Sequence, residues 1–345
     1  MRAEKSALFL ALIVLGGCAT APGRPTISNP VIDENFPDPA VLKAPDGYYY
    51  AYATQGEVGG RMQNIQVARS RTLAQWERVG DALPVKPKWA SRTQDFWAPH
   101  VSLHDGRYYL YYSAKPDAAL VDGKSGLCLA VATASRPEGP FTDIGNPLQC
   151  GEGFINIDPM AYDDPATGKR LLYWGSGFAP IKVQELAVDR MSFAQGSKPA
   201  ELVRVIPDAS KENYQRLVEG AWVTKHGDYY YMFYSGDNCC GPDAHYAVMV
   251  ARSASATGPF ETLAHTTGAP NSVIVEADSR WIAPGHNAIV QDDEDRYWIL
   301  FHAVDVRKSR EKDSDAVNSR RVMLVKEIEW VDGWPRIKRA SNEEE

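Results

Sequence analysis

Basic side chains are too few and too scattered in this 345-residue chain to form a phosphate-binding surface. Lys and Arg number 37 against 44 Asp and Glu, which gives a formal net charge of −7, and no part of the sequence forms a basic stripe. Because nucleic-acid binding needs clustered Lys and Arg, this composition argues against a nucleic-acid partner. After residue 15 no run is long and apolar enough to span a bilayer, so we expect the rest of the chain to be soluble.

Cysteine is also scarce, and the five cysteines present are not spaced like the ligands of a zinc site. Apart from Cys18 they are Cys128, Cys150, Cys239 and Cys240. Export would permit disulfides, and Cys128 and Cys150 lie in the same sequence repeat, so we expect a bond between these two. The sequence leaves the pairing of the other two open.

The N-terminal segment has the pattern of a targeting signal. A positively charged start precedes an apolar run from Ala7 to Leu15 that is too short to span a membrane as a mature helix. The run ends in Leu-Gly-Gly-Cys at Cys18, which is similar to the lipobox of bacterial lipoproteins; secretory cleavage shortly after Cys18 is the alternative. We expect a signal peptide over residues 1–17, a linker over 18–30, and export to a bacterial periplasm or cell envelope. A lipid on Cys18 would be the membrane contact.

The sequence contains a repeat. At intervals of roughly sixty residues a turn signal leads into a strand rich in aromatic residues, which is typical of repeat architectures. Alternation with period two and β-branched residues indicate further strands in each unit. We therefore predict an all-β fold, a single five-bladed β-propeller over residues 31–340 with its active site at one mouth of the central channel. The five segments are DGYYYAYA from Asp46, DGRYYLYYSA from Asp105, TGKRLLYWGS from Thr167, HGDYYYMFYSG from His226 and EDRYWILFHA from Glu294.

A short strand begins before each aromatic strand and is expected to line the channel. The five inner strands run the same way along the axis, so their starts should meet at one mouth. Three starts carry a carboxylate, and we expect Asp38, Asp158 and Glu219 to share one small site. The starting pairs are Asp38-Pro39, Pro99-His100, Asp158-Pro159, Glu219-Gly220 and His286-Asn287.

Three carboxylates at one mouth favour hydrolysis of a glycosidic bond. Like charges held close cannot all ionise freely, so one group should remain an acid while another stays anionic. Inverting glycosidases use such a pair, because one carboxyl group protonates the leaving oxygen while the other activates a water on the opposite face. Each acid alone has a structural explanation, as a turn residue or an ion-pair partner, but three in the same repeat position favour a site.

Aromatic residues and one histidine complete the candidate site. Phe96, Trp97 and Trp222 lie at or beside inner strands and are candidates for stacking against sugar rings, with packing between blades as the alternative. His286 begins the fifth inner strand and should point toward the axis. It is either a hydrogen-bonded core histidine or a ligand, directly or through water, of a cation in the channel.

Six motifs lie at or beside the inner strands and the fourth aromatic strand: NPVIDENFPDPAVL, FWAPHV, INIDPMAY, LVEGAWV, YYYMFYSGDNCCG and PGHNAIV. Together they resemble glycoside hydrolase family 43, over the chain from about Asn29 to Ile337. The resemblance implies a five-bladed propeller that acts with inversion on α-L-arabinofuranosyl and β-D-xylosyl linkages of plant cell walls. It also implies that Asp38 is the general base, that Glu219 is the general acid, and that Asp158 tunes the pKa of the acid and helps to orient it.

Different motifs of the sequence resemble family members with different substrates. The Cys239-Cys240 stretch followed by HYAVMVARS is similar to arabinanases, some of which hold calcium near a histidine placed like His286, so the resemblance implies calcium as a cofactor to test. The FPDP sequence around Asp38 is more similar to the xylosidase and arabinofuranosidase branch. We expect action on α-L-arabinofuranosyl linkages of plant cell-wall oligosaccharides or polysaccharides, with a β-D-xylosidase as the alternative.

Two further alternatives are less well supported. A propeller can bind sugars without catalysis, since a fold does not itself imply an activity, but the presence of all three acids argues against this interpretation. The related fructan and sucrose hydrolases carry Asn-Asp-Pro and Arg-Asp-Pro motifs. Here Pro37 precedes Asp38 and Ile157 precedes Asp158, so neither motif is present.

Overall fold

The structure is a computed structural model that describes residues 26–120, 123–175, 177–310 and 319–339. The predicted signal peptide and Cys18, with its predicted lipid, lie outside these residues. Helices are short in the described chain: α1 (Leu263–Thr267) and two 3-10 helices, Lys88–Ala90 and Lys211–Asn213. No helix there is long and apolar enough to cross a membrane.

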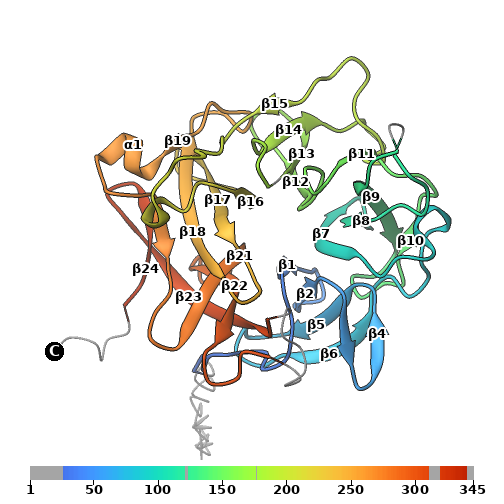
Figure 1. Cartoon of the computed structure of the whole chain (residues 1–345), viewed down its shortest axis with the longest axis horizontal. Helices are drawn as coiled ribbons and strands as arrows, with labels where there is room; N and C mark the ends of the chain where they lie inside the picture. Colours follow the sequence, from blue (N-terminus) through green and yellow to red (C-terminus); the bar gives the residue numbers. More distant parts are fainter. Residues whose placement is uncertain (1–25, 121–122, 176, 311–318, 340–345) are drawn as a thin grey trace, which may run out of the picture.

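Five antiparallel sheets surround a central axis and form the blades of a propeller, which confirms the predicted fold (Figure 1). The innermost strands of blades one to five are β1 (Ala40–Lys43), β7 (Phe96–His104), β12 (Met160–Asp163), β16 (Val218–His226) and β21 (Trp281–Gln291). The second strands are β2 (Tyr49–Ala53), β8 (Arg107–Ala114), β13 (Arg170–Trp174), β17 (Tyr229–Asn238) and β22 (Tyr297–Asp305).

The outer half of each blade is shorter and less regular. The third strands are β5 (Gln66–Ser70), β9 (Gly126–Ala134), β14 (Lys182–Glu185), β18 (His245–Ser253) and β23 (Arg321–Val331). The outermost strands are β6 (Glu77–Asp81), β10 (Thr142–Asp143), β15 (Ala200–Glu201), β19 (Glu261–Thr262) and β24 (Trp334–Ile337). Beside these, β11 (Gln149–Glu152) pairs with β9, β20 (Val273–Val275) pairs with β18, and β3 (Gly56–Val58) pairs with β4 (Arg61–Gln63).

Tyrosines of the second strands connect each blade to the next. Each ring packs in the interior while its hydroxyl donates a hydrogen bond to a backbone carbonyl of the following blade, so the buried phenol is satisfied. This explains why the repeat carries tyrosine and not only phenylalanine. The bonds run from Tyr52 to Pro137 (2.6 Å), from Tyr111 to Arg190 (2.9 Å), from Tyr173 to Ala256 (2.6 Å) and from Tyr231 to Gly333 (2.5 Å).

The ring closes where the N-terminal segment meets β23, and we call this contact the seam. Ile32 forms an antiparallel bridge with Met323. The side-chain amide of Asn29 donates to the carbonyl oxygen of Val325 (2.9 Å) and accepts from its N–H (2.8 Å). The first and last blades are therefore joined by segments from opposite ends of the described chain.

Two disulfides are present in the described chain. Cys128 in β9 is bonded to Cys150 in β11, where the two residues are paired in register, so the predicted bond is confirmed. Cys239 and Cys240 are bonded to each other just after β17.

Candidate active site

Every blade has a residue with a left-handed backbone within its inner strand or two residues before it, and blade five has a second one, Ala283 (φ 48°). For a residue other than glycine this conformation costs about 1–2 kcal/mol, and such strain persists mainly at functional sites. In β7, β16 and β21 a β-bulge lies at the same point, and bulges redirect the side chains beside them. The residues are Asp38 (φ 57°), Ala98 (φ 46°), Asp158 (φ 57°), Gly220 (φ 62°) and His286 (φ 47°).

This shared position corrects the predicted register in two blades. We expected Pro99 and Glu219 to be equivalent to Asp38, but Ala98 and Gly220 occupy that position and Glu219 lies one residue earlier. Glycine adopts the left-handed conformation without steric cost. Glu219 therefore reaches the site from a different backbone position from that of the two aspartates.

One pocket of about 290 Å³ brings together most of the predicted site residues. It is lined by Asp38, Asp158 and Glu219, from blades one, three and four. Trp97 from blade two and His286 from blade five also line it. The expectation that three carboxylates share one site is thus met in the geometry.

Two predicted substrate contacts are wrong. Phe96 is 0% exposed and packs in the hydrophobic core near Tyr112, with ring centroids 6.1 Å apart. Trp222 is buried beneath the pocket, where its ring lies 5.1 Å from that of His100. Side chains alternate along a strand, and the bulges change which face each one takes, so proximity in sequence did not place these rings in the pocket.

Asp38 is held as an anion. Its Oδ1 accepts a hydrogen bond from the Arg321 guanidinium (2.8 Å) and its Oδ2 accepts one from the Thr54 hydroxyl (2.6 Å). Burial raises the pKa of Asp38, but the positive charge of Arg321, with the nearby imidazoles of His286 and His302, outweighs burial and holds the pKa well below its usual value. Asp38 can therefore accept a proton.

Glu219 has the opposite environment. Burial raises its pKa to about 7, and the charge of Asp38 acts in the same direction, while a hydrogen bond from the Tyr246 hydroxyl to Oε1 (2.7 Å) opposes the rise. The second carboxyl oxygen is left to carry a proton. The Tyr246 ring is itself held close to Gly285, where an added Cβ would lie 2.0 Å from it, so only glycine fits at that position.

Asp158 binds the backbone beside Glu219. Its Oδ2 accepts the backbone N–H of Gly220 (2.9 Å), the residue that follows Glu219. Burial, with the charges of Glu219 and Asp38, raises the pKa of Asp158 well above its usual value. Two carboxyl groups with raised pKa values thus face one with a lowered pKa.

His286 lies between the two aspartates. Its Nδ1 is 3.7 Å from Oδ1 of Asp38 and 3.8 Å from Oδ2 of Asp158, and burial lowers its pKa, so the ring is neutral near pH 7. Among the described residues no group of three or more His, Cys, Asp or Glu side chains is arranged to hold a metal ion. Calcium takes six to eight oxygen ligands, so a cation beside His286 would depend on water for most of its ligands.

The sequence analysis did not predict the residues that hydrogen-bond to Asp38 and Glu219. Arg321, Thr54 and Tyr246 contact the carboxylates directly but lie outside the inner strands on which the prediction was based. The sequence pattern around these residues predicted strands but gave no sign of these contacts. The Cys239–Cys240 disulfide also lines the pocket.

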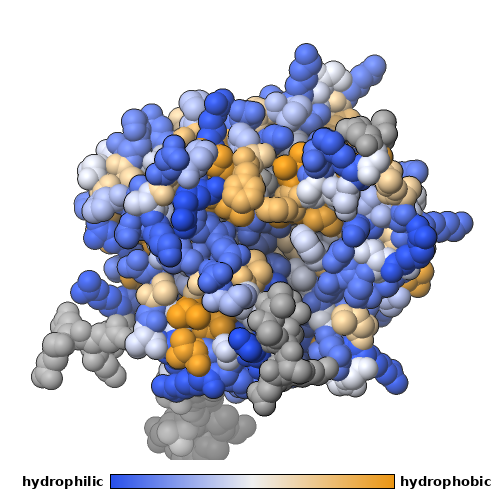
Figure 2. Space-filling view, viewed as in Figure 1, coloured by the Kyte–Doolittle hydropathy of each residue, from blue (hydrophilic) through white to orange (hydrophobic). Residues whose placement is uncertain are grey.

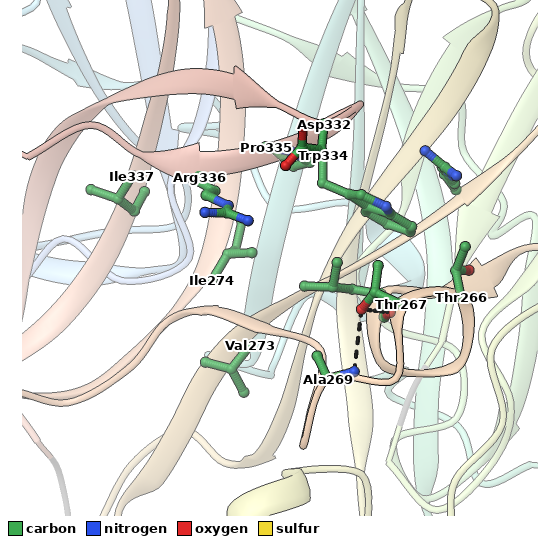
Figure 3. Close-up of a pocket in the computed structure, with 12 residues that line it drawn as sticks. Thr266, Thr267, Ala269, Val273, Ile274, Asp332, Trp334, Pro335, Arg336 and Ile337 are labelled. Atoms are coloured by element: carbon green, nitrogen blue, oxygen red, sulfur yellow. Dashed lines mark hydrogen bonds between the residues drawn. The ribbon is translucent and has the colours of Figure 1, made fainter.

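A larger hollow, of about 580 Å³, lies between α1, β20 and β24 (Figure 3). Trp334 and Arg336 of β24 line it, as does Thr267, whose hydroxyl oxygen accepts the N–H of Ala269 (3.3 Å). Within the described chain its lining brings no two carboxyl groups together. The smaller pocket therefore holds the acid and base chemistry, although it is not the largest hollow.

Known proteins match the chain over nearly its whole length. A probable arabinan endo-1,5-α-L-arabinosidase A of Aspergillus flavus is 28% identical over 317 residues, which is 88% of this chain and 91% of that protein. An extracellular exo-α-(1→5)-L-arabinofuranosidase of Cellvibrio japonicus is 25% identical over 318 residues, which is 87% of this chain and 85% of that protein.

The fold and the family model agree with these relatives. The crystal structure of a thermostable family-43 glycoside hydrolase superposes with a TM-score of 0.72 at 26% identity, covering 91% of this chain and 96% of that one. The model of glycosyl hydrolases family 43 matches residues 27–335, a span that includes the inner strands of all five blades and the three carboxylates. The chain belongs to glycosyl hydrolase family 43 and is a glycosidase.

Proposed function

We propose that this glycosidase hydrolyses α-L-arabinofuranosyl linkages of plant cell-wall arabinan, or of arabinose-substituted oligosaccharides and polysaccharides, with inversion. The opposite pKa shifts of Asp38 and Glu219 in one pocket carry the proposal of hydrolysis, because a glycosidase needs one anionic and one protonated carboxyl group. Inversion is what the resemblance to the family implies. The names of the fungal and Cellvibrio relatives support the arabinose specificity.

In the proposed reaction a water molecule attacks the anomeric carbon from the side of Asp38. Asp38 accepts a proton from that water while the new carbon–oxygen bond forms. The bond to the leaving group breaks, and its oxygen receives the proton of Glu219. Solvent then removes the proton from Asp38 and returns one to Glu219, which restores the starting state.

Other side chains position these two groups. Arg321 and Thr54 bind both oxygens of Asp38 and fix the direction in which it accepts the proton. Tyr246 binds one oxygen of Glu219, and Asp158 fixes the backbone of Gly220 next to it. Asp158 thus orients the acid through the backbone next to it.

A substrate panel tests the proposal. Initial rates on nitrophenyl α-L-arabinofuranoside, nitrophenyl β-D-xyloside and linear arabinan should show the arabinofuranoside or arabinan hydrolysed fastest. Proton NMR of the first product should show the anomer opposite to that of the substrate. Faster hydrolysis of the xyloside would favour the alternative, a β-D-xylosidase, in agreement with the FPDP motif around Asp38. Retention of the anomeric configuration would exclude the proposed mechanism.

We also propose that the protein is exported and held at the cell envelope by a lipid on Cys18. The short apolar run before Leu-Gly-Gly-Cys supports this proposal. An enzyme placed there would meet oligosaccharides before uptake.

A further inference from the structure

Two phenylalanines at the rim of the pocket lack a core in which to pack. Phe154 is 37% exposed and lines the pocket, and Phe178 is 73% exposed and stands next to it, with ring centroids 6.1 Å apart at 63°. The surface is mainly hydrophilic on the face drawn in Figure 2. Adjacent exposed aromatic rings that continue an active-site pocket commonly mark a binding surface.

The two rings are held in place by the backbone around them. A Cβ at position 177 would lie 2.5 Å from the Phe154 ring, so this ring packs directly on the glycine backbone. The carbonyl of Gly177 accepts the N–H of Val218 (3.3 Å), the residue just before Glu219. On the other loop, the carbonyl of Gly153 accepts the N–H of Leu127 (3.0 Å). The Phe154 ring therefore packs on a loop whose backbone is bonded next to Glu219, and Phe178 follows Gly177 in that loop.

The size of the pocket requires a longer substrate to pass over this rim. About 290 Å³ is at the small end for a ligand site, so a chain of several sugars must extend beyond the pocket. Glu219 donates to the oxygen that joins the cleaved sugar to its leaving group, so the next ring should lie on the side of the acid. Sugar rings present apolar C–H faces, and a rigid aromatic surface without hydrogen-bonding groups suits them.

We propose that Phe154 and Phe178 form a stacking subsite for the first sugar of the leaving group. The enzyme therefore acts on pentose oligosaccharides or polysaccharides in preference to glycosides of small alcohols, such as a methyl glycoside. This subsite rests on the proposed function of the same pocket. Phe178 is the outer ring and contributes binding of the leaving group, not acid or base chemistry.

The test compares Phe178→Ala with wild type on a trisaccharide and on the methyl glycoside of the same sugar, in the arabino or xylo series that the wild type hydrolyses. The KM for the trisaccharide should rise at least about fivefold, because removal of a ring that covers ~40 Å² of sugar loses binding in proportion to that area. The kcat for the trisaccharide and both constants for the methyl glycoside should stay within about twofold. Phe178→Trp should restore the KM.

Tyr229→Ala serves as the matched control, because Tyr229 is 39% exposed but begins β17, at the end of that strand away from Asn238 and the pocket. It should leave all constants unchanged. An unchanged trisaccharide KM in Phe178→Ala, or an equal rise on both substrates, overturns the subsite while the proposed function stands. A wild type that hydrolyses neither trisaccharide series overturns the proposed function and the subsite together.

Discussion

Tyr246→Phe should move the alkaline limit of activity to higher pH. The proposed acid works only when Glu219 is protonated, so activity should fall as the pH rises through the pKa of Glu219, which is about 7. The Tyr246 hydroxyl donates to Oε1 at 2.7 Å and lowers that pKa, because it stabilises the carboxylate more than the neutral acid. Removal of the hydroxyl leaves the phenyl ring in place and should raise the pKa.

The size of the shift follows from the strengths of the two hydrogen bonds. A bond to a charged group contributes about 1.5–3 kcal/mol and one to a neutral group about 0.5–1.5 kcal/mol. The difference of about 1–1.5 kcal/mol corresponds to about one pKa unit. The assay is kcat/KM against pH on an aryl glycoside, since this ratio reports the groups of the free enzyme.

Tyr234→Phe is the control for this experiment. Tyr234 lies in the neighbouring β17, is fully buried, and its hydroxyl has no hydrogen-bond partner within the described chain. Its removal should leave the alkaline limb in place. If Tyr246→Phe leaves that limb unmoved, or moves it to lower pH while the melting temperature is kept, Glu219 is not the acid that this reasoning requires.

Four further predictions concern other groups of the site and the N-terminus. Glu219→Gln should abolish hydrolysis of natural linkages but spare aryl glycosides with good leaving groups, which need less protonation; equal losses on both in steady-state rates would remove Glu219 from the acid role. Asp38→Asn should lower kcat at least about 10²-fold, and wild-type turnover would refute its role as base. A chelator should lower the melting temperature, calcium should restore it, and His286→Ala should weaken the effect. Full activity of calcium-free protein, verified by elemental analysis, would exclude a metal-binding role for His286. Cys18→Ser should move the protein from the membrane fraction to the soluble fraction, and an unmodified mature N-terminus by mass spectrometry would contradict the lipid.

The fold and the three carboxylates were accessible from sequence because both repeat with the blades. A turn followed by an aromatic strand is local information, and the register of Asp38 and Asp158 follows from it. The partners of these acids do not repeat. Arg321 reaches Asp38 across 283 positions of the sequence, and nothing in its own strand distinguishes it from a surface arginine.

Bulges account for the remaining differences. One extra residue in β7, after Trp97, and one in β16, after Glu219, change which of the following side chains face the mouth. Phe96 and Trp97 precede the bulge of β7 and point to opposite faces by ordinary alternation, so Trp97 lines the pocket while Phe96 is buried. A period-two pattern read from sequence assumes an unbroken strand and misses such a shift. The same effect placed Glu219 one position away from its expected register.

The seam makes the active site a late product of folding. Asp38 is translated among the first residues of the propeller, yet Arg321 belongs to β23 in the last blade, and Ile32 meets Met323 beside it. A growing chain that has formed four blades would have its proposed base without the guanidinium that keeps it ionised. Contacts between distant segments form slowly, so during refolding the recovery of hydrolysis should lag behind the recovery of tryptophan fluorescence. The return of hydrolysis would then measure when the seam between the first and last blades of the propeller forms.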